Sequence, residues 1–113
     1  MFLIAAALLA AAQPDRWVHL GGSPGVHEDY LDKESVRRSG DKVTLWTRRD
    51  FARGEATAWN ELELDCARRT ETILAWIRDE KGTVSHNVER PHRGAAPIAA
   101  GSVAERIFEM ACR

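Results

Sequence analysis

The residues best suited to chemistry are acidic side chains that alternate between Thr57 and Cys66 (TAWNELELDC). If this segment is a strand, Glu61, Glu63 and Asp65 lie on one face together with Trp59, because successive strand side chains point to opposite faces. Carboxylates at that spacing could bind a cation or act as an acid/base pair. The simpler interpretation is the solvated face of a half-buried sheet, and we favour it.

The histidines do not add a recognisable catalytic or metal-binding motif. They are His19, His27, His86 and His92, and none of them has the spacing of a metal-ligand pair. The chain also lacks nucleophile motifs such as G-x-S-x-G and S-x-x-K, and it has no glycine-rich phosphate loop. We therefore expect a non-enzymatic protein with no cofactor and no metal site. The enzymatic alternative is a small periplasmic hydrolase or ligand-binding enzyme that uses Glu61, Glu63 or His86.

Tryptophan is frequent for so short a chain, with four in 113 residues. Trp46, Trp59 and Trp76 each fall in the middle of an expected strand. Aromatic side chains presented by a sheet can form a ligand-binding surface. Packing in the core or over the sheet is the alternative, and it is the interpretation that we favour.

Cys66 and Cys112 are the two cysteines of the chain, so they allow a single intramolecular disulfide. The bond would close a loop of roughly 47 residues, for which the chain-entropy model gives about 4 kcal/mol of stabilisation. A redox-active pair is disfavoured, because such cysteines usually lie two residues apart beside a helix start. We predict a structural bond that ties the end of a strand to the last turn of a helix.

Hydrophobic alternation predicts an antiparallel sheet of about five to six strands. We expect strands over 16–20, 27–32, 42–51, 57–66, 69–78 and 83–88, and an irregular connection over 92–101. The clearest is 42–51, where Val43 and Leu45 point one way and Trp46 the other. The segment 69–78 is apolar on both faces, which is typical of a central strand covered on both sides.

The end of the chain changes to a helical period. Ser102 and Glu105 match a capping box, in which the two side chains satisfy free amide groups at a helix start. The apolar residues that follow recur at i, i+3, i+4 and i+7 and form one stripe: Ala104, Ile107, Phe108 and Ala111. The predicted fold is therefore α+β, an antiparallel sheet with a C-terminal helix packed on it and one disulfide.

The first twelve residues contain only Met, Phe, Leu, Ile and Ala. They are too short to span a bilayer, which takes about 20 apolar residues, and the small residues at 10–12 fit a signal-peptide cleavage site. We expect a signal peptide over 1–12 and one domain over 13–113; the alternative is a buried element of the domain. No cysteine follows the small residues, so we expect release as a soluble periplasmic or secreted protein with no stable membrane span after cleavage.

Composition limits the partners of this domain. The 16 basic and 17 acidic side chains nearly balance, with a net charge of −1. Such a chain lacks the long-range positive field that attracts nucleic acid or anionic membranes. We therefore expect no nucleic-acid binding.

Several short motifs together resemble a known family. They include Arg16-Trp17-Val18, Tyr30-Leu31-Asp32, the strand 40–46 (GDKVTLW), Asp65-Cys66 and the closing Ala111-Cys112. This arrangement resembles the surface-adhesin protein E family over essentially the whole mature chain. The G-D-x-V-x-x-W strand and the D-C plus terminal-C pairing are its most specific parts.

The resemblance implies a compact antiparallel sheet with a C-terminal helix and the same disulfide. The adhesin that names the family binds host matrix proteins such as vitronectin and laminin, and it can dimerise. The resemblance therefore implies that this chain is a binding or interaction module of the bacterial envelope, with envelope or host matrix proteins as partners. The alternative is a structural envelope protein without a ligand, which would present a flat surface.

Overall fold

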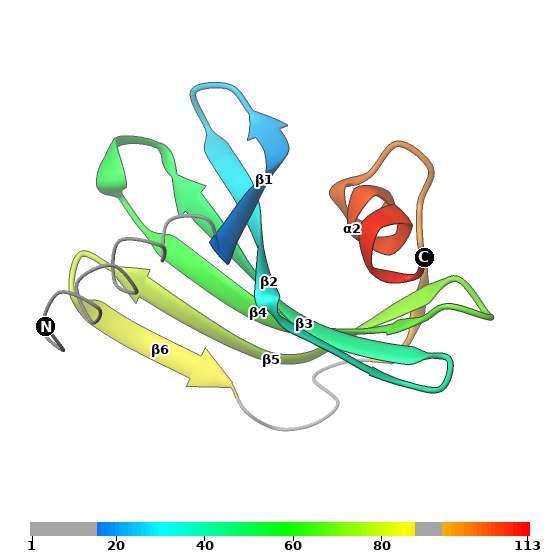
Figure 1. The fold of residues 1–113 in the computed structure, drawn as a ribbon. Coiled ribbons are helices and arrows are strands. Elements are labelled where there is room, and N and C mark those ends of the chain that lie inside the picture. Colours follow the sequence, from blue (N-terminus) through cyan, green and yellow to red (C-terminus); the bar gives the residue numbers. More distant parts are fainter. Residues whose placement is uncertain (1–15, 88–93) are drawn as a thin grey trace, which may run out of the picture.

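The computed structural model describes residues 16–87 and 94–113, and it places them in one antiparallel sheet and one α-helix (Figure 1). The elements in chain order are β1 (Trp17–Ser23), β2 (His27–Ser39), β3 (Lys42–Phe51), the short 3-10 helix η2 (Ala52–Gly54), β4 (Thr57–Asp65), β5 (Thr70–Glu80), β6 (Thr83–Asn87), β7 (Ala96–Pro97) and α2 (Val103–Ala111). The predicted α+β fold is confirmed. The expected signal peptide over 1–12 and His92 lie outside the described residues.

The sheet is a meander in which each strand pairs with the next, in the order β1-β2-β3-β4-β5-β6. The two-residue β7 pairs with β5 as well, so the connection over 92–101 is less irregular than expected. A turn of two residues, Lys81 and Gly82, connects β5 to β6. Both residues have positive φ, at 52° and 91°. A two-residue turn with two positive φ angles matches the twist of the paired strands.

The hydrophobic core lies between the sheet and α2, on the face that we call the helix face (Figure 1). The seven residues of this core are Leu20, Leu31, Val43, Leu45, Leu62, Leu64 and Ile107. Leu45 and Leu64 are among the most completely buried side chains, at 1% and 0% exposure. Val43 and Leu45 share one face and Trp46 lies on the other, as predicted, and the face of Val43 and Leu45 is the buried one. The opposite side of the sheet is called the open face below.

Helix α2 begins as the capping-box motif predicts. The Ser102 hydroxyl accepts a hydrogen bond from the Glu105 amide at 3.1 Å. The Glu105 carboxylate in turn accepts from the Gly101 amide at 3.1 Å. Ile107 and Phe108 are buried against the sheet. The apolar stripe predicted from the helical period therefore does face the core.

Arg106 fastens α2 to the first strand by donating a hydrogen bond to the Leu20 carbonyl. The next residue, Gly21, has a φ of 107° and marks a bulge between β1 and β2. This positive φ favours glycine, and a Cβ here would also displace the Arg106 guanidinium, which would lie 2.5 Å from it. The first strand, expected over 16–20, continues through the bulge to Ser23.

The Cys66–Cys112 disulfide is present, with 5.5 Å between the two Cα atoms. Cys66 follows the end of β4, and Cys112 is the residue that caps α2 rather than a member of its last turn. Both pack against the core. The bond therefore ties sheet to helix, as predicted.

Asp65 precedes the disulfide-bonded Cys66 and is buried, with only 7% of its surface exposed. It lies on the same face of β4 as Glu61 and Glu63. Its carboxylate accepts hydrogen bonds from the amides of Arg68 at 2.9 Å and Ala67 at 3.0 Å, and Lys42 lies 3.3 Å away. The hydrogen bond from the Arg68 amide is the largest cause that holds the pKa of Asp65 below its usual value. The expectation of a fully solvated acidic row is therefore wrong at Asp65, because the chain reversal after β4 uses this carboxylate.

Strand β5 changes phase in the middle, which its alternation did not predict. Ile73 pairs with Leu62 and packs on the helix-face core, whereas Ile77 pairs with Trp59 on the open face. A register shift between these two pairs leaves one extra residue in β5, and such a bulge reverses the direction of the side chains beyond it. The expectation that 69–78 is covered on both sides is also wrong, because Ile77 lines an open hollow.

Within the described residues, no helix has the length and apolar character that crossing a bilayer would take.

Candidate functional site: an aromatic hollow on the open face

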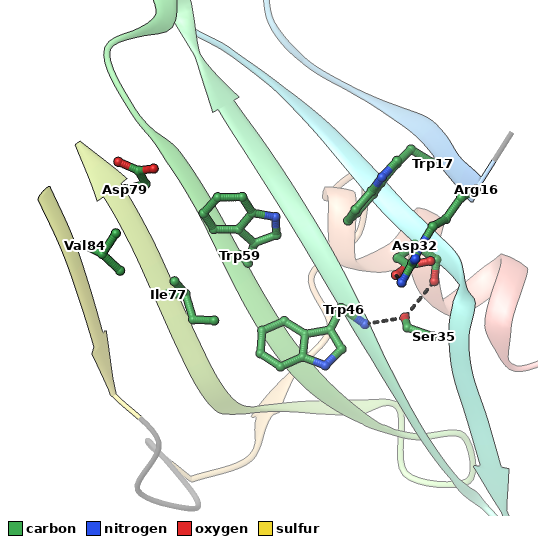
Figure 2. A pocket seen from close by; sticks show the side chains of 9 residues that line it. All are labelled: Arg16, Trp17, Asp32, Ser35, Trp46, Trp59, Ile77, Asp79 and Val84. Atoms are coloured by element: carbon green, nitrogen blue, oxygen red, sulfur yellow. Dashed lines mark hydrogen bonds and ion pairs between the residues drawn. The ribbon is translucent and has the colours of Figure 1, made fainter. Parts of the chain in front are cut away.

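The open face of the sheet carries a hollow of about 560 Å³ (Figure 2). Its lining is aromatic and aliphatic in the middle and charged at both ends. The lining residues are Arg16, Trp17, Asp32, Ser35, Trp46, Trp59, Ile77, Asp79 and Val84. They come from β1 to β6 and from the residue that precedes β1, so the hollow extends across the whole sheet.

Strand register brings the three tryptophans of the hollow together. Trp17 pairs with Asp32, and Asp32 pairs with Trp46, so these side chains form one row across β1, β2 and β3. Trp59 lies on β4 opposite Arg48, two residues along β3 from Trp46. Residues in such a diagonal relation lie about 7–8 Å apart, within reach of large aromatic side chains. Figure 2 shows the broad faces of Trp46 and Trp59 turned outward from the sheet, with Trp17 edge-on beside them.

An ion pair with a buried carboxylate and a partly exposed guanidinium forms one end of the hollow. The Arg16 guanidinium lies 2.6 Å from the carboxylate of Asp32, whose side chain is only 4% exposed. This hydrogen bond raises the pKa of Arg16 above its usual value. The Asp32 carboxylate also accepts from the Glu34 amide at 3.1 Å. Asp32 is therefore already neutralised.

The irregular part of β2 shapes this end of the hollow. Between Asp32 and Arg37 the register shifts, because four residues of β2 stand opposite Leu45 alone. Within that segment the Ser35 hydroxyl donates to the Asp32 carbonyl at 2.7 Å and accepts from the Trp46 amide at 2.8 Å. Ser35 thus holds the bulged strand to β3 where regular pairing fails. The strand expected over 27–32 continues through this bulge to Ser39.

Arg48 lies beside the hollow between two aromatic rings. Its guanidinium carbon is 4.5 Å from the ring centroid of Trp17 and 4.5 Å from that of Tyr30. Asp50 lies 3.0 Å from its Nε atom. Distances below about 6 Å to a ring centroid are favourable for a cation over an aromatic face. The open face therefore already binds one cation between aromatic rings with a carboxylate beside it.

The other end of the hollow is formed by β5 and β6. Ile77 and Val84 provide aliphatic surface, and Val84 is 59% exposed. The carboxylate of Asp79 accepts a hydrogen bond from the Gly82 amide at 2.8 Å. Among the described residues, no cationic side chain forms an ion pair with Asp79.

The acidic and histidine candidates share the open face but do not line the hollow. Glu61 pairs with Trp46 across β3 and β4, and Glu63 lies 3.7 Å from Lys42 at the far end of the strands. His86 is exposed on β6 opposite Ile77. The structure therefore places these three residues on one surface without bringing them into one pocket. No group of metal-binding side chains occurs in the described part of the chain.

The tryptophans divide between the two faces. Trp46 and Trp59 line the hollow, so they cover the open face of the sheet and do not pack in the core. Trp76 pairs with Asn60 and belongs to the helix face. Trp17 and the Arg16–Asp32 pair were missed, because the weak alternation over 16–20 did not indicate which residues would meet across three strands.

A small disulfide-bonded α+β domain with an aromatic hollow on one sheet face has the architecture of a binding module. Comparison with known families agrees: the family model described as surface-adhesin protein E matches residues 17–113. The chain therefore belongs to the surface-adhesin protein E family, as the sequence motifs indicated. Searches of curated proteins and of solved structures found no match.

Proposed function

We propose that this protein is an exported, non-enzymatic binding domain of the bacterial envelope, periplasmic or secreted, and that its binding surface is the aromatic hollow. The observation that carries this proposal is the grouping of Trp17, Trp46 and Trp59 on the face that α2 leaves uncovered. Exposed aromatic groups with a few polar side chains are typical of ligand and protein interfaces. A purely structural protein does not need such a hollow.

Two features support export. Residues 1–12 have the apolar character of a signal peptide, which leaves 13–113 as the mature domain. The Cys66–Cys112 bond is of a kind that persists in oxidising compartments outside the cytoplasm. The family membership supports envelope or host matrix proteins as partners.

Site-specific photo-crosslinking in the native cell tests the proposal. A photoreactive amino acid replaces Val84, which is 59% exposed at the rim of the hollow. The matched control carries it at Met110, a 47% exposed apolar residue on α2. We expect Val84 to capture specific envelope or matrix proteins that Met110 does not. Equal capture at both positions, or none at Val84, contradicts the proposal.

A further inference from the structure

The open face is more acidic than the chain as a whole. The strand register places acidic side chains on this face at Glu28, Asp32, Asp50, Glu61, Glu63, Asp65 and Asp79, and basic ones at Arg37, Lys42 and Arg48, with Arg16 at the end of the hollow. The acidic groups outnumber the basic ones, although the whole chain carries a net charge of only −1. A surface with this excess attracts cationic partners.

Asp79 is the carboxylate of the hollow that still lacks a cation among the described residues. Asp32 has Arg16 at 2.6 Å, whereas the partner of the Asp79 carboxylate within residues 16–87 and 94–113 is the Gly82 amide. Asp79 lies two residues along β5 from Ile77, which pairs with Trp59. Asp79 and Trp59 are therefore diagonal neighbours on the same face, as Figure 2 shows.

In the part of the chain that the structure describes, Trp46 and Trp59 are the two rings of the hollow with no cation over them. Trp17 already faces Arg48, with Arg16 at 6.0 Å. Among the described side chains, no guanidinium or ammonium group lies over Trp46 or Trp59. The outward face of Trp59 lies beside the Asp79 carboxylate. A ring with a neighbouring carboxylate is the combination that Arg48 already uses with Asp50.

We propose that the hollow binds a lysine or arginine side chain from a basic segment of a partner protein, with its cation between the Trp59 ring and the Asp79 carboxylate. This inference rests on the proposed function, because it specifies the chemistry of the same surface. A purely apolar side chain would remove water from Asp79 without replacing its hydration, which costs free energy. A cation restores a partner for the carboxylate and also gains attraction from the ring face.

Titration of the oxidised protein with three matched peptides tests the assignment. The probes are acetyl-Gly-Lys-Gly-amide, its arginine analogue and its norleucine analogue, which keeps the aliphatic stem but lacks the charge. Binding is followed by the indole N–H signals of Trp46 and Trp59 in NMR. We expect both cationic peptides to shift these signals, the norleucine peptide to bind about tenfold more weakly, and added salt to weaken the cationic peptides selectively.

Two isosteric variants separate a local contact from bulk charge. Asp79→Asn removes the charge but keeps an oxygen that can accept from the Gly82 amide. Glu80→Gln removes the same charge one residue along β5, where Glu80 forms an ion pair with Arg78. We expect Asp79→Asn to weaken binding of the lysine peptide about fivefold or more, and Glu80→Gln to change it less than twofold.

Three outcomes overturn the inference. Equal loss in the two variants would show that only bulk charge matters. Equal binding of the norleucine peptide would show an apolar site. Binding of a neutral oligosaccharide such as cellotriose, without binding of the cationic peptides, would show a glycan site. In the last two cases the proposed function stands, because the hollow still binds a ligand. Failure of all probes together with no specific capture at Val84 contradicts both proposals.

Discussion

The two faces of the sheet are built from alternate residues of the same strands, yet they differ in burial and in the side chains that they present. On β3, Leu45 is 1% exposed beneath α2, and the next residue, Trp46, lies in the hollow on the open face. On the helix face, Leu64 and Ile107 also pack in the core, and the disulfide links the sheet to α2. The open face presents rings, carboxylates and guanidiniums to solvent.

Strand alternation thus separates the residues that stabilise the fold from those that we propose bind a partner. One face has the helix, the aliphatic core and the covalent bond, so it can supply the free energy of folding. The other face can therefore present polar and aromatic side chains that would pack badly in a core but can contact a ligand. The four predictions below test this separation, in order of decreasing effect.

The largest effect is expected from removing the disulfide. The double variant Cys66→Ser with Cys112→Ser loses the bond across a sequence separation of 46 residues. We expect about 4 kcal/mol less unfolding free energy, because the unfolded chain gains conformational freedom. Urea unfolding measures it, and reduction of the native protein serves as the control. A loss below about 1 kcal/mol would show that the bond does not hold the helix face together.

Adjacent substitutions on β3 compare the two faces directly. Leu45→Ala opens a cavity in the core, and we expect it to lower the unfolding free energy by about 3 kcal/mol. Trp46→Leu, one residue away, keeps an apolar side chain on the half-buried open face and should cost about 1 kcal/mol. Urea unfolding of both variants gives the difference. Equal losses would contradict the proposed division between stability and binding.

Removing the helix cap should have a smaller effect. Ser102→Ala loses the hydroxyl that accepts from the Glu105 amide at 3.1 Å. We expect a loss of about 1 kcal/mol in unfolding free energy. Ser85→Ala is the control, because Ser85 is exposed on β6. A Ser102→Ala variant as stable as this control would mean that α2 does not depend on its cap.

The smallest effect is a pH dependence at the turn after β4. Because the Arg68 amide lowers the pKa of Asp65 in the folded state, the ionised carboxylate stabilises the fold. This contribution is complete above the unfolded pKa of about 3.9 and is lost as the pH falls through the lower folded pKa.

Thermal unfolding between neutral and acidic pH measures this contribution. Asp65→Asn should remove part of the acid-induced decrease in Tm, whereas Asp41→Asn, at an exposed position, should not. An unchanged acid profile in the Asp65 variant would rule out this carboxylate as a source of the pH dependence.

Much of the fold follows from local patterns. Alternation over 42–51 predicts the bounds of β3 and places Leu45 and Trp46 on opposite faces. The capping box at Ser102 predicts the start of α2, and two cysteines leave one possible disulfide. Each of these signals is a pattern within a few residues or the number of cysteines, so it can be recognised without the tertiary structure.

The site depends on bulges, which local patterns do not reveal. Strict alternation predicts Ile73 and Ile77 on one face, but the bulge between them places Ile77 in the hollow. The extra residues in β2 after Asp32 likewise place Ser35 in the wall of the hollow. A bulge forms where pairing with a neighbouring strand favours it, so its position depends on the partner strand as well as on the bulged one.

The sequence by itself determined the kind of elements, their order, the disulfide and the family motifs, because these depend on periodicity and spacing along the chain. Only the tertiary structure decided which face α2 covers, and therefore that Trp46 and Trp59 remain accessible. It also decided that Trp17 joins them and that Asp79 lies beside Trp59. The physical reason is that register across several strands, set by bulges and core packing, brings together residues from β1 to β6.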